Sequence, residues 1–171
     1  MAIFGTSYKE KSYTKISDYF IALSNETGSL ISNLKLQKLV YYADAWHLAN
    51  YGRPLIQEDF QAWVHGPAIP SLYGEYKQFG WKPIIREDLT QEKLYELLKD
   101  FPKPTMDLLN LVTEEYFGLS AFELEKLTHN EEPWLKTRQG LTDDQPSERI
   151  IDKNLMRDYY SRFIQNGPES K

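Results

Sequence analysis

The sequence predicts a mainly α-helical fold, a compact bundle of about six or seven helices with one small β-hairpin or ribbon near residues 54–66. Three observations lead to this prediction. Apolar residues recur at helical spacing along most of the chain, the period changes to two in only one place, and there is no cysteine to staple a looser fold. With 171 residues, 41% hydrophobic and 26% charged, the composition is typical of one globular domain.

The clearest element is a helix expected to begin with Asn33 as its N-cap and to end at Tyr51, before Gly52. Apolar residues lie on every side of this helix, so we expect it at the centre of the fold. Residues 129–150 are polar and acidic and are expected to be mostly loop. The remaining helices are expected at 15–25, 68–78, 91–99, 105–116, 121–128 and 153–165.

One short helix has a clear start signal, because Ser120 and Glu123 form a capping-box pattern. Its apolar residues Phe122, Leu124 and Leu127 are expected to be buried.

The one change of period lies at 60–64, where alternating side chains predict a strand. Residues 55–56 are its expected partner. The chain then turns at 65–67, where Gly66 permits backbone angles that other residues avoid and Pro67 fixes the next one. Gly66 and Pro67 are therefore predicted to shape the turn.

Residues 1–171 are expected to form a single domain, with 1–12 as a loosely held leader and 166–171 as a frayed tail. No apolar run is long enough for a signal peptide or a membrane span, so we expect a cytoplasmic protein and no membrane partner. The net charge of −5 comes without a basic, aromatic-interleaved stripe. Nucleic acid is therefore not an expected partner.

Catalytic motifs are missing from the sequence: it has no nucleophile elbow, no phosphate-binding glycine loop and no thiol. Asp44 and His47 lie three residues apart on one helix, but a metal needs a third ligand, so a structural role is expected for both. No catalytic residue, metal or cofactor is predicted. One alternative stays open, a metal-dependent or acid–base hydrolase that uses His65, His129 and nearby carboxylates, which must then converge in one cleft.

The shaped turn lies beside several aromatic residues, and such turns position binding residues as well as redirecting the chain. Tyr and Trp side chains combine a large apolar surface with a polar tip, which suits contact with a partner. The predicted partner-binding residues are Trp63, His65, Tyr73 and Tyr76.

Several linked motifs carry a family resemblance. They are LQKLVYYA at 36–43, AWHLA at 45–49, GRPL at 52–55, QAWVHGPA at 61–68 and PSLY at 70–73. Their order and spacing resemble the Panacea domain, also described as the SocA-like or GepA-like phage-associated family. Thr128-His129 and Pro133-Trp134 resemble the later signature of that family, so the resemblance covers roughly residues 16–134.

The resemblance implies a mainly helical domain with a small β element. It also implies a non-enzymatic antitoxin that neutralises a cognate protein toxin by direct binding. Members resemble one another in this domain but have varied toxins, and at least one kind is an adaptor that delivers its toxin to a cellular protease. Many members add an N-terminal domain, whereas this chain is expected to stand alone. The remaining alternative is a phage-associated interaction protein without a toxin partner.

Overall fold

The computed structural model describes residues 10–165 and has a mainly helical architecture with one small hairpin, as predicted. The described range contains eight α-helices, one more than the upper expected number. The elements are α1 (Thr14–Thr27), α2 (Asn33–Tyr51), β1 (Gln61–Trp63), β2 (Gly66–Ala68), α3 (Pro70–Glu75), the 3₁₀ helix η1 (Lys77–Phe79), α4 (Gln91–Asp100), α5 (Lys103–Val112), the π-helical turn η2 (Thr113–Phe117), α6 (Ala121–His129), α7 (Glu132–Thr137) and α8 (Lys153–Gln165).

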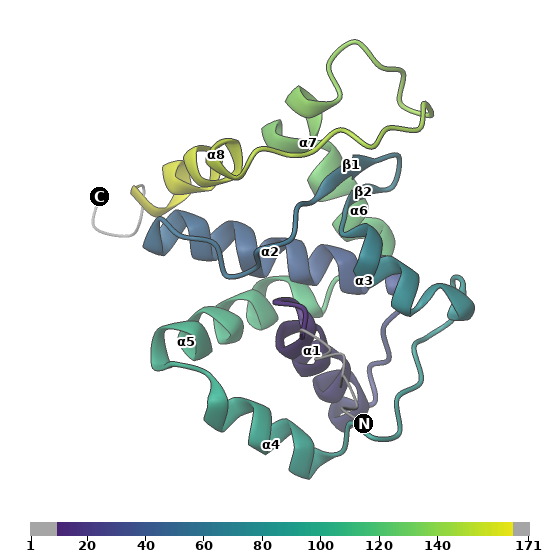
Figure 1. Cartoon of the computed structure of the whole chain (residues 1–171), viewed down its shortest axis with the longest axis vertical. Coiled ribbons are helices and arrows are strands. Elements are labelled where there is room, and N and C mark those ends of the chain that lie inside the picture. Colours follow the sequence, from purple (N-terminus) through teal and green to yellow (C-terminus); the bar gives the residue numbers. More distant parts are fainter. Residues whose placement is uncertain (1–9, 166–171) are drawn as a thin grey trace, which may run out of the picture.

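Helix α2 is the centre of the fold, as its all-round apolar character predicts. It packs against α1, α3, α5, α6, α8 and β2, and 14 of its 19 residues are buried. Figure 1 shows α2 crossing the middle of the molecule, with α8 along one side and α1 and α5 on the other. Before its exposed last turn, a helix enclosed in this way has almost no solvent-exposed surface, so most of its polar residues must be accommodated inside the protein.

The start of α2 differs by one residue from the prediction. Ser32 is the N-cap, because its hydroxyl accepts a hydrogen bond from the Lys35 amide at 3.2 Å. The side-chain amide of Asn33 instead donates through Nδ2 to the Tyr73 carbonyl at 3.0 Å. The C-terminal signal is confirmed, since Gly52 has φ of 69° in the left-handed region.

A buried carboxylate fixes the segment after α2. The Asp44 side chain is fully buried, and its Oδ1 accepts from the amides of Leu55 and Ile56 at 2.9 and 3.0 Å. Its Oδ2 is paired with Lys153 Nζ at the start of α8. The structural role expected for Asp44 is therefore confirmed, as is that of His47, whose Nδ1 lies 2.7 Å from the Arg53 carbonyl oxygen.

The expected strand partner at 55–56 was wrong, because Asp44 already holds the amides of both residues. Strand β1 instead pairs antiparallel with β2, so that Trp63 lies opposite Gly66. Gly66 and Pro67 thus begin the return strand, and the turn itself lies at 64–65. On its other edge β1 is covered by 149–151: the Ala62 amide donates to the Arg149 carbonyl at 2.9 Å.

Helix α6 buries less than predicted. Its capping box is present and Leu124 is fully buried, but Phe122 and Leu127 are 71% and 38% exposed. The helix faces α2 and β2 with one narrow stripe, on which Thr128 follows Leu124 one turn later.

The expected loop at 129–150 contains the short helix α7, which was missed. Its second residue is Pro133, a residue that the first turn of a helix accepts, and Trp134 anchors it in the core. Arg138 at its C-cap is 4% exposed and donates to the carbonyls of Ala62 and Gln145 at 2.9 and 2.6 Å. This one guanidinium holds the following loop against β1.

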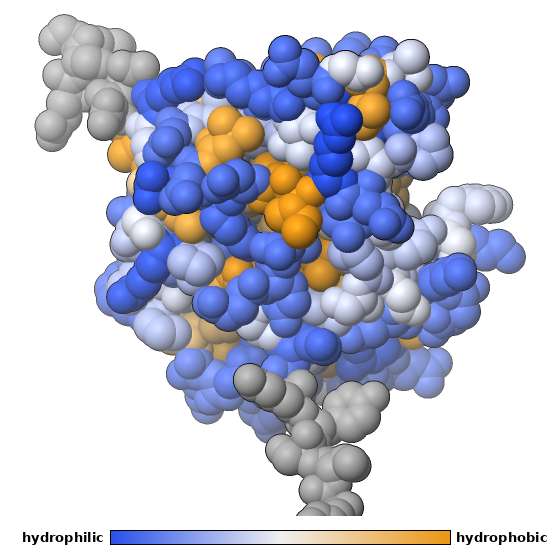
Figure 2. Space-filling model, turned by 45° about the horizontal axis from the view of Figure 1, so that its top comes forward, coloured by the Kyte–Doolittle hydropathy of each residue, from blue (hydrophilic) through white to orange (hydrophobic). Residues whose placement is uncertain are grey.

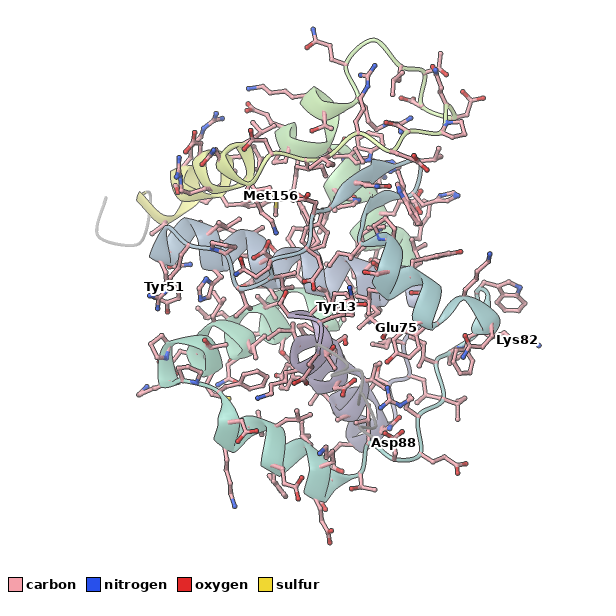
Figure 3. The ribbon with its side chains drawn as sticks, in the orientation of Figure 1. Tyr13, Tyr51, Glu75, Lys82, Asp88 and Met156 are labelled. Atoms are coloured by element: carbon pink, nitrogen blue, oxygen red, sulfur yellow. The ribbon has the colours of Figure 1, made fainter. Side chains whose placement is uncertain are left out.

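The chain entering α1 is tied to its neighbours. The Ser12 amide donates to Glu58 at 3.0 Å, and the Tyr13 hydroxyl donates to Glu75 at 2.7 Å. Figure 3 labels both residues of the second pair. Residues 1–9 of the expected leader and the expected tail lie outside the described residues. Within the described range, no helix is both long and apolar enough to cross a bilayer.

Hydrophobic and hydrophilic residues are mixed over the surface of the protein. On the face in Figure 2, apolar residues gather in small groups that hydrophilic residues surround. Scattered apolar residues of this kind are normal on a protein surface and do not mark a site by themselves. A candidate site therefore has to be located by a cavity and by the chemistry of its walls.

Candidate functional site

A cavity of about 510 Å³ opens between the hairpin, the first turns of α2, α3 with the segment after it, and the loop at 146–148. This volume lies in the usual range of ligand sites. Three of the four predicted contact residues, Trp63, His65 and Tyr73, line it. The fourth, Tyr76, is 4% exposed and its hydroxyl accepts from Arg86 Nη1 at 2.8 Å. Tyr76 is thus a core residue and not a wall of the cavity.

Aromatic rings form much of the wall. Trp63 and Tyr73 meet edge to face with ring centroids 5.1 Å apart. The Trp63 indole also donates to Gln61 Oε1 at 2.7 Å, which fixes its orientation. Trp81 lines the rim with 84% of its surface exposed. Figure 3 labels the next residue, Lys82, far out on the segment beyond α3.

The floor of the cavity requires glycine at position 66. Gly66 has φ of 100°, which side chains rarely adopt, and it is tightly enclosed. An added Cβ would lie 2.5 Å from Lys38 Cε and 2.7 Å from Thr128 Oγ1. The hairpin, α2 and α6 therefore meet here at a distance that only glycine permits.

Lys38 is the most unusual residue of the wall. Its side chain is 1% exposed, yet it lines the cavity. Burial lowers the pKa of its ammonium group to about 7, against the opposing effect of Glu125. Nζ donates one hydrogen bond, at 3.1 Å, to the Pro67 carbonyl. The sequence offered a signal for Lys38: a helix that is apolar on all sides has to bury its lysines.

Two histidines approach one carboxylate, Glu125, but of these three residues only His65 lines the cavity, whereas the hydrolase alternative requires all of them in one cleft. His65 Nδ1 lies 2.9 Å from Glu125 Oε1, and His129 Nε2 lies 3.9 Å from the same oxygen. His129 stacks on Trp134 with centroids 4.0 Å apart, and its Nε2 is buried without a hydrogen-bond partner. Burial lowers the pKa of His129, which favours its neutral form. Within residues 10–165, no set of three or more His, Asp or Glu side chains could hold a metal ion.

A second polar cluster lies inside the core rather than at the cavity. Tyr42 and Tyr116 stack with ring centroids 4.0 Å apart, and the Tyr42 hydroxyl donates to Glu131. Burial raises the pKa of Glu131 from 4.5 to about 7, and the hydrogen bond from Tyr42 works in the opposite direction. This carboxyl therefore favours its protonated form more in the folded than in the unfolded chain.

Glu131→Gln is expected to remove a fall in stability between about pH 5 and pH 8. Because the folded-state pKa is raised, the folded chain binds more protons in this window, and wild-type stability decreases as pH rises. The neutral amide does not titrate, so the variant should gain about 2 to 3 kcal/mol over the wild type across the window. Urea unfolding of both proteins at the two pH values measures this. The difference between the two proteins cancels the effects of other titrating groups such as Lys38. If both proteins lost stability equally from about pH 5 to pH 8, the raised pKa would not belong to Glu131.

The cavity has aromatic walls, a buried lysine and a hydrogen-bonded histidine at its rim, so it is the candidate binding site of this helical domain. Comparison with known proteins shows which family the chain belongs to. The model of the family described as "Antitoxin SocA-like, Panacea domain" matches residues 36–135, which is more than half of the chain. The protein therefore belongs to the SocA-like Panacea family.

A curated relative agrees with the family. The chain is 42% identical to Antitoxin SocA of Caulobacter vibrioides (strain NA1000 / CB15N) over 64 residues, which are 37% of this chain and 34% of the relative. The alignment thus spans about a third of the length of that relative. No solved structure matches the chain.

Proposed function

We propose that this protein is a cytoplasmic antitoxin that neutralises a protein toxin by binding it directly, without catalysis. Membership of the SocA-like Panacea family carries the proposal. The matched range, 36–135, includes most of α2, the hairpin and the cavity-lining residues from Gln37 to Trp81. The surroundings of the cavity supply the kinds of side chain that a protein contact uses.

The proposed contact surface is the rim of the cavity, formed by Trp63, His65, Tyr73 and Trp81. Trp and Tyr dominate the binding energy of many protein interfaces, because they bury a large area at low entropic cost. His65 and Trp81 are largely exposed, so a partner can reach them without any rearrangement of the fold.

Co-expression with the neighbouring reading frame tests the function. We expect that frame to arrest growth alone and this chain to restore growth. If the neighbour is toxic and this chain gives no rescue, the antitoxin proposal fails. If the neighbour is harmless, the alternative of a phage-associated interaction protein without a toxin gains support.

Substituting the rim tests where the toxin binds. His65→Ala and Trp81→Ala are each expected to weaken toxin binding at least about tenfold, because both remove exposed contact groups. The matched control is Tyr95→Ala, which removes an exposed aromatic ring from α4, outside the cavity. Calorimetric titration with purified toxin measures the affinities. Unchanged affinity in both rim variants, with folding intact, would place the contact surface elsewhere.

Toxin lifetime separates a simple blocker from a proteolytic adaptor. A blocker leaves the toxin present but inactive, whereas an adaptor makes the toxin disappear as long as the cellular protease is active. Immunoblots of the toxin in cells with and without the protease distinguish the two. We propose the blocker as the minimal mechanism and the adaptor as its extension.

One observation favours the second candidate function, acid–base hydrolysis: His65 and His129 converge on Glu125. A His beside a carboxylate can act as a general base. Hydrolysis of p-nitrophenyl acetate by the wild type and by His65→Gln tests this directly. A rate that depends on His65 would support the hydrolase, and equal background rates would count against it.

A further inference from the structure

The position of Lys38 calls for an explanation beyond packing. Removing an ammonium group from water is costly unless a carboxylate or several acceptors compensate it. An ammonium group has three donors, and Lys38 uses one of them, for the Pro67 carbonyl. In the described part of the chain, no carboxylate lies within ion-pairing distance of its Nζ. Glu125 is the acidic residue whose charge acts on Lys38, and its Oε1 is hydrogen-bonded to His65. Glu148 lines the same cavity but forms no ion pair with Lys38.

The neighbouring buried lysine shows how the same helix accommodates such a group structurally. Lys35 Nζ donates to the Phe117 carbonyl at 2.5 Å and lies 5.0 Å from the centroid of the Phe117 ring. Lys35 is not part of the cavity wall. Lys38 differs because its unused donors border a cavity. The surface of this cavity is mostly apolar, although Gln37, Ser147 and Glu148 also line it.

Both edges of the nearby hairpin are occupied. Residues 149–151 cover β1, while at β2 the Pro67 carbonyl accepts from Lys38 and the Ile69 amide donates to Gln37. An extended peptide passing through the cavity would therefore leave its backbone groups without partners from the sheet. The end of a chain suits this site better, because it brings a carboxylate together with a single apolar side chain.

We propose that the cavity binds the C-terminal residue of a polypeptide partner. Its carboxylate accepts hydrogen bonds from Lys38 Nζ, and its apolar side chain packs against Trp63 and Tyr73, with Trp81 closing over it. Because the partner is a protein, this inference rests on the proposed function and specifies how the partner is recognised. Charge complementarity carries it: a buried cation without a counter-ion meets an anion that arrives with apolar surface.

Acetylated tripeptides test the inference without the natural partner. The probes are acetyl-Gly-Gly-Leu, acetyl-Gly-Gly-Phe and acetyl-Gly-Gly-Trp, each with a free carboxylate and as the C-terminal amide. At pH 6, below the pKa of Lys38, at least one free acid should bind in calorimetry. It should also bind at least about tenfold more tightly than its amide, the loss expected when a charge-assisted hydrogen bond is removed.

The variants locate the binding. Lys38→Met should abolish the preference for the acid, and its thermal midpoint should not fall, because methionine replaces a buried charge by apolar volume. Lys35→Met is the matched control: it removes a buried ammonium group from the same helix outside the cavity and should keep the preference. Trp81→Ala, at an exposed position, should weaken binding of the acid without changing the fold. Equal binding of acid and amide, no binding of any free acid at millimolar concentration, or an unchanged preference in Lys38→Met would overturn the proposal.

A parallel titration with the toxin separates this inference from the proposed function. If the toxin binds the wild type and Lys38→Met equally well, the antitoxin function stands and the chain-end inference fails. If the free acids bind through Lys38 but the neighbouring toxin is neither bound nor neutralised, the cavity inference stands and the antitoxin function fails.

Discussion

Asp44→Ala is expected to lower the free energy of unfolding by about 3 to 5 kcal/mol, a large fraction of the stability of a domain of this size. The Asp44 carboxylate is fully buried and satisfies two amides and the Lys153 ammonium group. Removing it leaves a half-buried cation and two buried donors without an acceptor. Urea denaturation followed by far-UV circular dichroism measures the loss.

The control for Asp44 is an ion pair at the surface. Asp107 and Lys103 on α5 are 57% and 85% exposed, with 2.9 Å between Oδ2 and Nζ. Asp107→Ala should change stability by no more than about 0.5 kcal/mol, because water screens an exposed pair. A loss below about 1 kcal/mol in Asp44→Ala would mean that the 55–56 segment and α8 are not held by this carboxylate.

Gly66→Ala is the second substitution with a large expected effect, a loss of about 2 to 4 kcal/mol. At φ of 100° an alanine is strained whatever the surrounding space, and here its Cβ would also overlap the Lys38 and Thr128 side chains. The strain falls on the floor of the cavity, so peptide and toxin binding should weaken together with stability. Thermal and urea unfolding give the size of the effect.

Gly74→Ala is the matched control for Gly66. Gly74 lies in α3, its Cβ would meet nothing within 4 Å, and its φ is not positive. Alanine is the better helix former by about 1 kcal/mol, so this variant should be as stable as the wild type or more stable. If both variants unfolded at the same urea concentration, the tight approach at Gly66 would not limit stability.

The fold was predictable from local signals wherever a helix has a long run of apolar residues at helical spacing and a clear end. Helix α2 is the best example, with its stop at Gly52. Helix α7 was hidden because its six residues are too short to show a period and contain Pro133. The strand partner of β1 was misassigned because the tertiary contact of Asp44 with 55–56 leaves no trace in the sequence.

The candidate site was predictable only in part. Trp63, His65 and Tyr73 could be found because they cluster along a shaped turn, and the structure brings them to one cavity. Glu125 and Trp81 could not be found from the sequence. The role of Glu125 depends on how α6 packs against the hairpin, and that of Trp81 depends on the position of the segment after η1. Tyr76 shows the converse: an aromatic residue at a favourable spacing can equally well be part of the core.

The contact between α2 and α8 can form only late in the synthesis of the chain, because α8 lies near its C-terminal end. Lys153 follows Asp44 by 109 residues, and at about 5 to 20 residues per second its synthesis comes roughly 5 to 20 seconds later. During that interval the central helix has been made, but the counter-ion of Asp44 and one of the helices that cover α2 have not. Nascent chains of this protein thus leave the α8-facing side of α2 uncovered for seconds, although α1, α3, α5, α6 and β2 are already made and can pack against its other sides.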